Sequence, residues 1–472
     1  MKHVIVAAGV ALALVGAAQA RDLVQVYDDA VLYDPQIQAA DATRLAAREA
    51  APQALAALLP QISGDYALSR TKSQSSTVES FLPGAPDAAT TTYTDQHGYN
   101  LQLQQSVFSW ANWKSLSRAH KQVAQAEAQY KAAQEDLIQR VAVAYFNVLS
   151  AQDTLDADQA ALTAVTQQLE QANKRYDVGL IPITDVKEAQ AAHDADAAAV
   201  IDAKRQLASM QQALREITNQ DYPALAKPGD DMPLTPPQPA DPEHWVQVSM
   251  DQNLSLLSSR LAADVARDSV EVSRSGHLPS VSIVGSRGVQ NDTTTGTSIV
   301  GGPPPFGGAT SLNYPGSQNS SEIQLQVTVP IFSGGATQSQ VRQAQYNWIA
   351  AKDNVQLVSR KTEHLARDSY NGLVSKIAQV NALRRGLESA QAALDATTAG
   401  YEVGTRTEVE VLQGRQSLVL AQTTYAQSRY DYLLDVIALR LAAGTLDRAT
   451  LLEINKSLTA LQGGPGAAPA AQ

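Results

Sequence analysis

Cysteine is absent from the 472-residue sequence. This absence excludes disulfide bonds, cysteine metal ligands, thiol catalysis and attachment of a lipid to an N-terminal cysteine. Aromatic residues are also scarce, at 5% of the chain, although large aromatic side chains usually fill a thick globular core. The chain is therefore expected to make thin, extended contacts.

Basic residues are in the minority. The chain has 36 Lys and Arg residues against 47 Asp and Glu residues, which gives a formal net charge of −11. Binding to nucleic acid is disfavoured, because neutralising phosphates requires a basic face. The sequence shows neither a nucleophile–base pairing nor a metal-ligand spacing, and we expect no enzyme activity, no metal site and no cofactor.

No apolar run reaches the length of a membrane-spanning helix. The run from Val4 to Val15 follows a basic start and precedes Ala18-Gln19-Ala20, which is typical of a secretory signal peptide. We predict a signal peptide over residues 1–20, cleaved after Ala20. Since a spanning helix needs ~20 apolar residues, any passage of the mature chain through a membrane must use strands.

The sequence matches itself at a shift of about 220 residues. LQLQQSVFS, beginning at Leu101, corresponds to LQVTVPIFS, beginning at Leu325, and RYDVGL around Gly179 corresponds to GYEVGT around Gly404. The match predicts five segments: the signal peptide, a first repeat (21–220), a Pro-rich equatorial connector (221–243), a second repeat (244–443), and a C-terminal equatorial segment with a disordered tail (444–472).

Each repeat predicts the same order of elements. An Ala-rich helix ends at a proline, two strands follow, and a very long helix turns at a glycine into a shorter return helix. The predicted opening helices are 22–57 and 244–275, the strands 62–69, 99–108, 281–288 and 323–332, and the long helices 111–178 and 335–400. The stretches 71–96 and 289–320 are predicted to be exposed loops between strands.

Four strands per chain are too few to close a membrane barrel, for which about eight is the practical minimum. Open sheet edges are not tolerated in lipid. The chain must therefore oligomerise, and sequence alone allows either a dimer or a trimer.

Six segments resemble the TolC family of outer-membrane efflux and secretion ducts. They are LPQI and LPSV at strand starts, AYFNVLSAQ in the first long helix, RYDVGLIPITDV at the first turn, QAQYNW after Phe332 and GYEVGTRTEVEVL at the second turn. The resemblance covers essentially the whole mature chain apart from the tail after Leu461.

The resemblance implies an α+β membrane protein. The expected assembly is a homotrimer whose chains give four strands each to a twelve-stranded transmembrane β-barrel, continued by a long periplasmic α-helical coiled-coil barrel. The implied function is the outer-membrane exit duct of a tripartite efflux pump or a type I secretion system in a Gram-negative cell. The implied partners are a periplasmic adaptor (membrane fusion) protein and an inner-membrane RND, MFS or ABC transporter.

The resemblance also implies a gate at the two turns between the long and return helices. Polar links between helix pairs hold the periplasmic end of such ducts shut, and the matching residues are Thr184, Asp185, Tyr401 and Arg406. Arg406 can donate charge-assisted hydrogen bonds to Asp185, so that breaking them would release a helix pair like an iris. Local helix capping would account for the same residue types. The glycines of these turns, Gly179 and Gly404, mark the expected contact with the adaptor.

Family members carry two acidic rings at the pore constriction. The matching positions are Glu410 and Gln413, so the second carboxylate is missing, and Glu408 is a candidate substitute. A competing interpretation is that Glu410 turns back to cap its own helix with Thr407. We expect weaker block by cations than in a relative with two rings.

A periplasmic coiled-coil adaptor or structural protein is the alternative function, since it would also contain antiparallel helical hairpins. An adaptor of this kind is expected to contain one hairpin and several globular β domains. This sequence instead predicts two hairpins, each joined to a strand pair. The internal repeat therefore favours the duct.

Overall fold

The computed structural model describes residues 20–77, 88–229, 232–300 and 308–459. The predicted signal peptide, except Ala20, and the end of the predicted tail lie outside these ranges. The chain divides into two compact units. Of the described residues, the helical unit comprises 20–44, 126–229, 232–259 and 354–459, and the sheet unit comprises 45–77, 88–125, 260–300 and 308–353.

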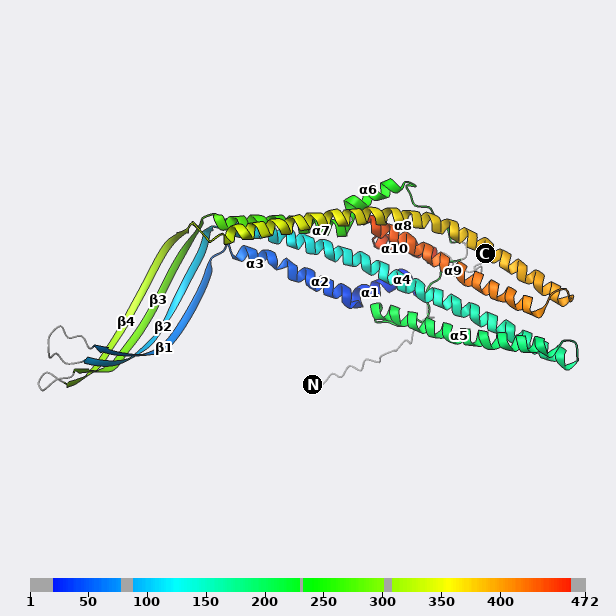
Figure 1. The fold of residues 1–472 in the computed structure, drawn as a ribbon, viewed down its shortest axis with the longest axis horizontal. Coiled ribbons are helices and arrows are strands. Elements are labelled where there is room, and N and C mark those ends of the chain that lie inside the picture. The colour runs from blue at the N-terminus through cyan, green and yellow to red at the C-terminus, as the bar shows by residue number, and fades with distance from the viewer. Residues whose placement is uncertain (1–19, 78–87, 230–231, 301–307, 460–472) are drawn as a thin grey trace, which may run out of the picture. The chain divides into compact units, whose positions relative to one another are not determined.

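The elements follow the same order twice along the chain (Figure 1). In the first half they are α1 (Leu23–Tyr33), α2 (Pro35–Arg48), α3 (Ala50–Ala56), β1 (Gln61–Thr77), β2 (Ala88–Phe108), α4 (Trp110–Asp177) and α5 (Ile183–Thr218). In the second half they are α6 (Pro242–Gln252), α7 (Leu254–Arg274), the 3₁₀ turn η1 (Ser275–His277), β3 (Ser280–Val300), β4 (Gly308–Thr328), α8 (Ala336–Glu402), α9 (Glu408–Ala443) and α10 (Arg448–Thr459).

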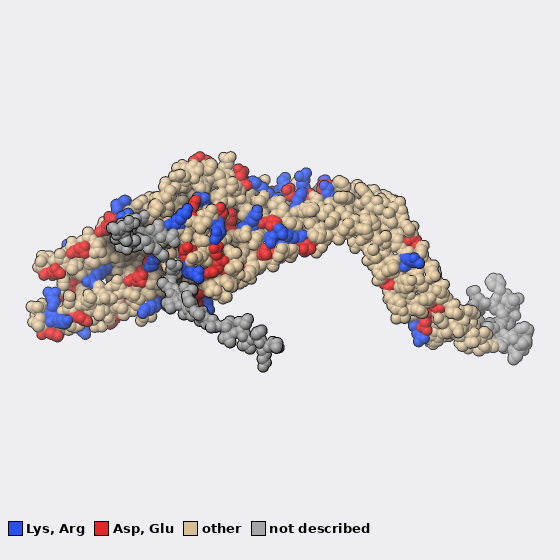
Figure 2. All heavy atoms as spheres, turned by 180° about the vertical axis from the view of Figure 1, so that it is seen from behind, with Lys and Arg blue, Asp and Glu red and all other residues tan. Residues whose placement is uncertain are grey.

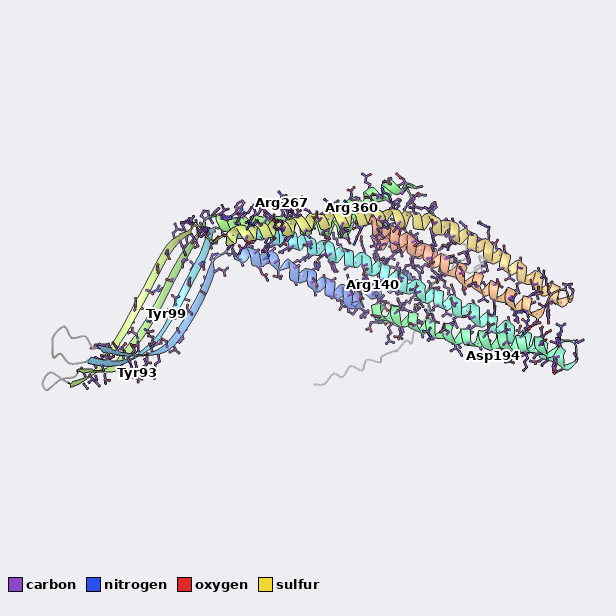
Figure 3. The ribbon with its side chains drawn as sticks, viewed as in Figure 1. Tyr93, Tyr99, Arg140, Asp194, Arg267 and Arg360 are labelled. Atoms are coloured by element: carbon purple, nitrogen blue, oxygen red, sulfur yellow. The ribbon has the colours of Figure 1, made fainter. Side chains whose placement is uncertain are left out.

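The predicted opening helices are interrupted, which corrects the prediction of continuous helices. Pro35 begins α2, where its missing backbone N–H is not needed. The Asp34 carboxylate accepts hydrogen bonds from the backbone N–H groups of Gln36 and Ile37, at 3.2 and 3.3 Å. It also accepts one from Arg140 of α4 at 2.6 Å, which connects the break to the long helix. Figure 3 labels Arg140 on α4.

The second opening helix breaks at Asn253, between α6 and α7. The Asn253 side chain accepts a hydrogen bond from the backbone N–H of Leu256 at 3.0 Å and donates one to the carbonyl of Ala442 at 3.2 Å. An asparagine that caps a helix start in this way favours a break rather than a continuous helix.

The sheet is antiparallel, in the order β1-β2-β3-β4. Tyr66 of β1 lies opposite Tyr99 of β2, which lies opposite Val289 of β3. Thr94 and Thr294 share a side-chain hydrogen bond of 3.1 Å between β2 and β3. β1 and β4 are the outer strands of the sheet.

The prediction of exposed loops over 71–96 and 289–320 is wrong for most of their length. The strands extend to Thr77 and Val300 and begin again at Ala88 and Gly308. These stretches are rich in Thr, whose β-branched side chain suits a strand, and the antiparallel ladder satisfies their backbone groups. Polar composition misled the prediction, because a strand without an apolar face gives no alternation of apolar and polar residues.

Among the described helices, none combines the length and the apolar character that crossing a bilayer requires. Figure 2 shows basic and acidic residues interspersed over the helices and few charges over the sheet, on the face in view.

The core of the helical unit is centred on α4. Tyr145 and Phe146 are fully buried. The Phe146 ring stacks on Tyr430 of α9 at 5.8 Å between centroids and meets Tyr145 edge-on at 5.5 Å. The Tyr145 hydroxyl donates to the carbonyls of Arg21 and Ala226, at 3.1 and 2.7 Å. The core therefore joins α4, α9, the N-terminal segment and the Pro-rich connector.

A polar cluster fastens the connector to the same two helices. Asp153 of α4 accepts hydrogen bonds from Lys227 of the connector at 2.6 Å and from the Tyr430 hydroxyl of α9 at 2.5 Å. Arg429 of α9 donates to the carbonyls of Pro228 and Gly229. These bonds hold α4 and α9 together at the level of the connector.

Glu135 makes the stability of the helical unit depend on pH. Burial raises its pKa from 4.5 to about 7. A carboxyl whose folded-state pKa is raised opposes folding when ionised, so stability falls as the pH rises from about 4.5 through about 7. We expect Glu135→Gln to melt at the wild-type temperature near pH 4 and above it near pH 8, in circular-dichroism melts. A difference that does not change with pH would contradict this role for Glu135.

Candidate gate at the two distal turns

Two helical hairpins end at the same end of the helical unit (Figure 1). We call the α4–α5 turn and the α8–α9 turn the distal turns. Gly179 and Gly404 occupy them with φ of +76° and +80°, a left-handed conformation that glycine adopts without strain. The backbone N–H of Leu180 donates to the carbonyl of Arg175 at 2.9 Å, and that of Thr405 donates to Gly400 at 2.8 Å. Both long helices thus end in a glycine turn of similar geometry.

Arg175 links the ends of α4 and α8. Its Nη1 donates to the Tyr401 hydroxyl at 3.1 Å, and its guanidinium carbon lies 5.4 Å from the centroid of the Tyr401 ring. Burial raises the pKa of Tyr401 to about 12, with further contributions from Glu408. The hydroxyl is therefore protonated at neutral pH and accepts the arginine hydrogen bond as a neutral group.

Gln168 and Glu408 make a second link, between α4 and α9. The Gln168 amide donates to the Glu408 carboxylate, and the two residues are only 9% and 4% exposed. Glu408 is the first residue of α9, where the helix dipole favours a negative charge. A buried carboxylate whose partner comes from another helix makes separation of the two helices unfavourable.

The gate residues expected from sequence lie at these turns, and two of their contacts are local. The Thr184 hydroxyl donates to Asp185 at 3.2 Å, and Arg406 donates to Glu410 at 2.8 Å. In the single chain, Arg406 bonds Glu410 rather than Asp185. The charge of Asp185 nevertheless contributes to the raised pKa of Tyr401.

Sequence reasoning missed Arg175 and Gln168. Arg175 lies in the RYDVGL segment quoted for the first turn, four residues before Gly179. A cation in the last turn of a helix complements the helix dipole. The position of Arg175 in the last turn of α4 could therefore have marked it as a candidate residue of the gate. Gln168 carries no signal in the sequence, because nothing local distinguishes this buried glutamine from the exposed glutamines of the same helix.

The three constriction residues differ in their surroundings. Glu410 forms a capping box: its carboxylate accepts from the backbone N–H of Thr407 at 2.8 Å, while the Thr407 hydroxyl accepts from the backbone N–H of Glu410 at 3.4 Å. The Thr407 backbone bond and Arg406 lower the pKa of Glu410. Gln413 is exposed, whereas Glu408 faces α4. The structure therefore gives the capping role to Glu410 in the single chain.

His193, Asp194 and Asp196 lie on α5, and Figure 3 labels Asp194. His193 and Asp194 form a 3.2 Å contact. In the part of the chain that the structure describes, no group of three or more His, Asp or Glu side chains is arranged to hold a metal ion.

A family model described as outer membrane efflux protein matches residues 26–220 and 245–445. The chain belongs to the outer membrane efflux protein family. Both matched ranges contain a strand pair and a helical hairpin, so the match covers both halves of the chain. A periplasmic adaptor with a single hairpin does not have this organisation.

Similar proteins are channels and secretion proteins. The chain is 34% identical over 445 residues to outer membrane protein TolC of Escherichia coli (strain K12), covering 93% of this chain and 86% of TolC. It is 29% identical over 437 residues to the alkaline protease secretion protein AprF of Pseudomonas aeruginosa, covering 91% and 85%. Its fold matches that of the Campylobacter jejuni CmeC outer membrane channel with a TM-score of 0.71 at 18% identity, covering 93% and 89%.

These comparisons confirm the resemblance to the TolC family, the fold class and the outer-membrane location. The protein is an exit duct of the outer membrane used by efflux and secretion systems.

Proposed function

We propose that three copies of the chain form one duct, which is closed at the distal turns by the Arg175–Tyr401 and Gln168–Glu408 links. These two links connect the first hairpin, through α4, with the second hairpin, through α8 and α9. This observation carries the proposal. Cargo passes when the links break and the hairpins separate.

The sheet supports assembly into a barrel. Four strands with β1 and β4 outermost leave two edges that must be paired, and three copies supply twelve strands. An apolar row crosses all four strands, because Ile62 pairs with Leu103, Leu103 with Gly285, and Gly285 with Ile323. Ile62 and Ile323 are 77% and 87% exposed in the single chain. This row suits the lipid-facing surface of a barrel.

The energies of the links suit a gate. A hydrogen bond to a charged group contributes about 1.5–3 kcal/mol, and an exposed cation–π contact about 0.5–1 kcal/mol. In each protomer these two links hold the end shut. Contacts with a periplasmic adaptor protein could supply a similar free energy and so replace the links. We propose that Asp185 and Arg406, which are not bonded to each other within one chain, meet between neighbouring protomers.

The proposed partners are the proteins that would deliver cargo to an outer-membrane exit duct. We propose that a periplasmic adaptor protein contacts the distal turns around Gly179 and Gly404 and that an inner-membrane RND, MFS or ABC transporter supplies the cargo. The matched family is described as outer membrane efflux protein, and one relative is named as an alkaline protease secretion protein. We therefore propose drugs and proteins as the two candidate cargo classes.

Purified protein in detergent and in planar lipid bilayers tests this function. Light scattering corrected for detergent should give the mass of three chains, and single insertions should give stable pores of low conductance. A monomer, or a protein that makes no pores, would overturn the proposal.

Gln413→Asp tests the proposed constriction. In a trimer this change adds three carboxylates one helical turn from Glu410, so a trivalent cation such as La³⁺ should block the pore at a concentration at least about tenfold lower. Gln422→Asp, at an exposed position farther along α9, is the matched control and should not change the block. Equal block in wild type and Gln413→Asp means that this position does not face the pore.

A further inference from the structure

A groove of about 290 Å³ lies between α4, α5 and α9 within the helical unit. Its walls come from residues 154–165, 192–199 and 412–423. The lining is mostly apolar, and it includes three ionisable side chains. The lining residues used below are Val165, Ala192, Val419, Asp158, Asp196 and Arg415.

Asp158 has no counter-ion in the single chain. Among the described residues it forms no hydrogen bond or ion pair, and the charge that acts on it is that of Asp196. Burial raises the pKa of Asp158, and the neighbouring carboxylate raises it further. Burial also raises the pKa of Asp196, while His193 and Arg415 act in the opposite direction. Asp158 is thus a partly desolvated carboxylate beside a like charge.

Arg415 brings an unused donor to the same groove. Its Nη1 atom is buried and has no hydrogen-bond partner among the described residues. A buried donor without an acceptor is unfavourable and is seldom left so in native proteins. Among the described residues, Asp158 thus has no bonded cation and the Arg415 Nη1–H has no bonded acceptor, although both side chains line the same groove.

We propose that the groove binds an amphipathic organic ammonium ion that also carries a hydrogen-bond acceptor. The ammonium group pairs with Asp158, and the acceptor receives the Nη1–H of Arg415. The hydrocarbon part of the ligand lies against Val165, Ala192 and Val419.

The charges and the lining select this class over simpler ligands. Two carboxylates against one guanidinium disfavour an anion. A bare metal ion requires several oxygen or nitrogen ligands around it. This groove is mostly apolar, and among the described residues no group of three or more His, Asp or Glu side chains could hold a metal ion. The site goes beyond the proposed gate, because its α4 residues precede Gln168 and its arginine, Arg415, follows Gln413 on α9.

The test uses dibucaine, a tertiary amine with an amide carbonyl and an aromatic ring. Because the chain has no cysteine, Ala192→Cys places a single thiol in the groove. The full mature chain in lipid nanodiscs is labelled with neutral methyl methanethiosulfonate at increasing dibucaine concentrations. We expect dibucaine to slow labelling at least about tenfold at saturation, and quinoline-4-carboxamide, which lacks the ammonium group, to have no effect.

Variants locate the binding. Adding Asp158→Asn should raise the dibucaine concentration for half-protection at least about tenfold, and Arg415→Met should raise it as well. Asp202→Asn removes an exposed carboxylate that pairs with Arg205 on the same helix and should leave protection unchanged. A thiol at exposed Ala198 should not be protected.

Equal protection with and without Asp158 would show nonspecific apolar partitioning and would overturn the proposal. Absence of protection in the Ala192→Cys protein would overturn it too. Circular-dichroism melts of each variant separate loss of binding from loss of fold. The readout is binding rather than conductance, so failure of the gate and failure of this site are distinguishable.

Discussion

Combining Arg175→Ser with Gln168→Leu should open the duct. The first change removes the arginine link to Tyr401, and the second removes the amide that α4 donates to the buried Glu408 carboxylate. A buried charge that loses a hydrogen-bond partner is destabilised, and this cost is relieved when α9 moves away from α4 into water. If each protomer loses about 1.5–3 kcal/mol of closing free energy, the open–closed equilibrium shifts at least tenfold per protomer. The expected result is at least a severalfold rise in single-channel conductance.

The matched control is Arg205→Ser with Gln190→Leu. These residues are also an arginine and a glutamine, but their hydrogen bonds, to Asp202 and Asp194, stay within α5. Planar-bilayer recordings of the control should match wild type. If the control opens as far as the gate variant, or if the gate variant stays at wild-type conductance, the two links do not hold the duct shut.

Phe146→Ala should cause the largest loss of stability in the helical unit. The side chain is fully buried and packs against Tyr145 and Tyr430, and removal of a buried phenylalanine destabilises by about 3–5 kcal/mol. Since Tyr145 and Tyr430 also hold the connector, we expect the connector to loosen together with the α4–α9 contact. Urea unfolding followed by the helical circular-dichroism signal measures the effect.

Two further variants show whether burial is the cause. Tyr346→Ala removes an aromatic ring that is 68% exposed on α8 and should change the unfolding midpoint little. Phe146→Leu keeps most of the apolar volume and should lose less than Phe146→Ala. A Phe146→Ala protein that unfolds at the wild-type midpoint would show that this cluster is not the core.

The helical hairpins could be predicted closely from sequence. The predicted long helices, 111–178 and 335–400, compare with Trp110–Asp177 and Ala336–Glu402 in the structure. Neither contains a proline, and each ends at a glycine with positive φ. Such punctuation is local, so a single sequence is sufficient to read it.

The strand lengths and the links between hairpins could not be predicted. Thr-rich stretches on either side of residues 78–87 form strands because the neighbouring strands pair with them, which is a nonlocal effect. Arg175 and Tyr401 are separated by 226 positions, and their contact depends on how each helix is rotated about its axis. Glu408 was predicted as a candidate for the pore, but which face of α9 packs on α4 is fixed by tertiary contacts.

A reversible cross-link between α4 and α9 tests whether the duct opens by separation of these two helices. Gln168→Cys with Glu408→Cys and Arg175→Ser in the cysteine-free chain removes both links and provides two thiols, which a bis-methanethiosulfonate with an ethylene spacer can join. The spacer is needed because cysteine side chains are shorter than those of Gln and Glu. We expect high conductance before cross-linking, wild-type low conductance after it, and high conductance again after a reductant is added. Conductance that ignores both cross-linker and reductant, despite confirmed cross-linking, would contradict a duct that opens by separating these helices.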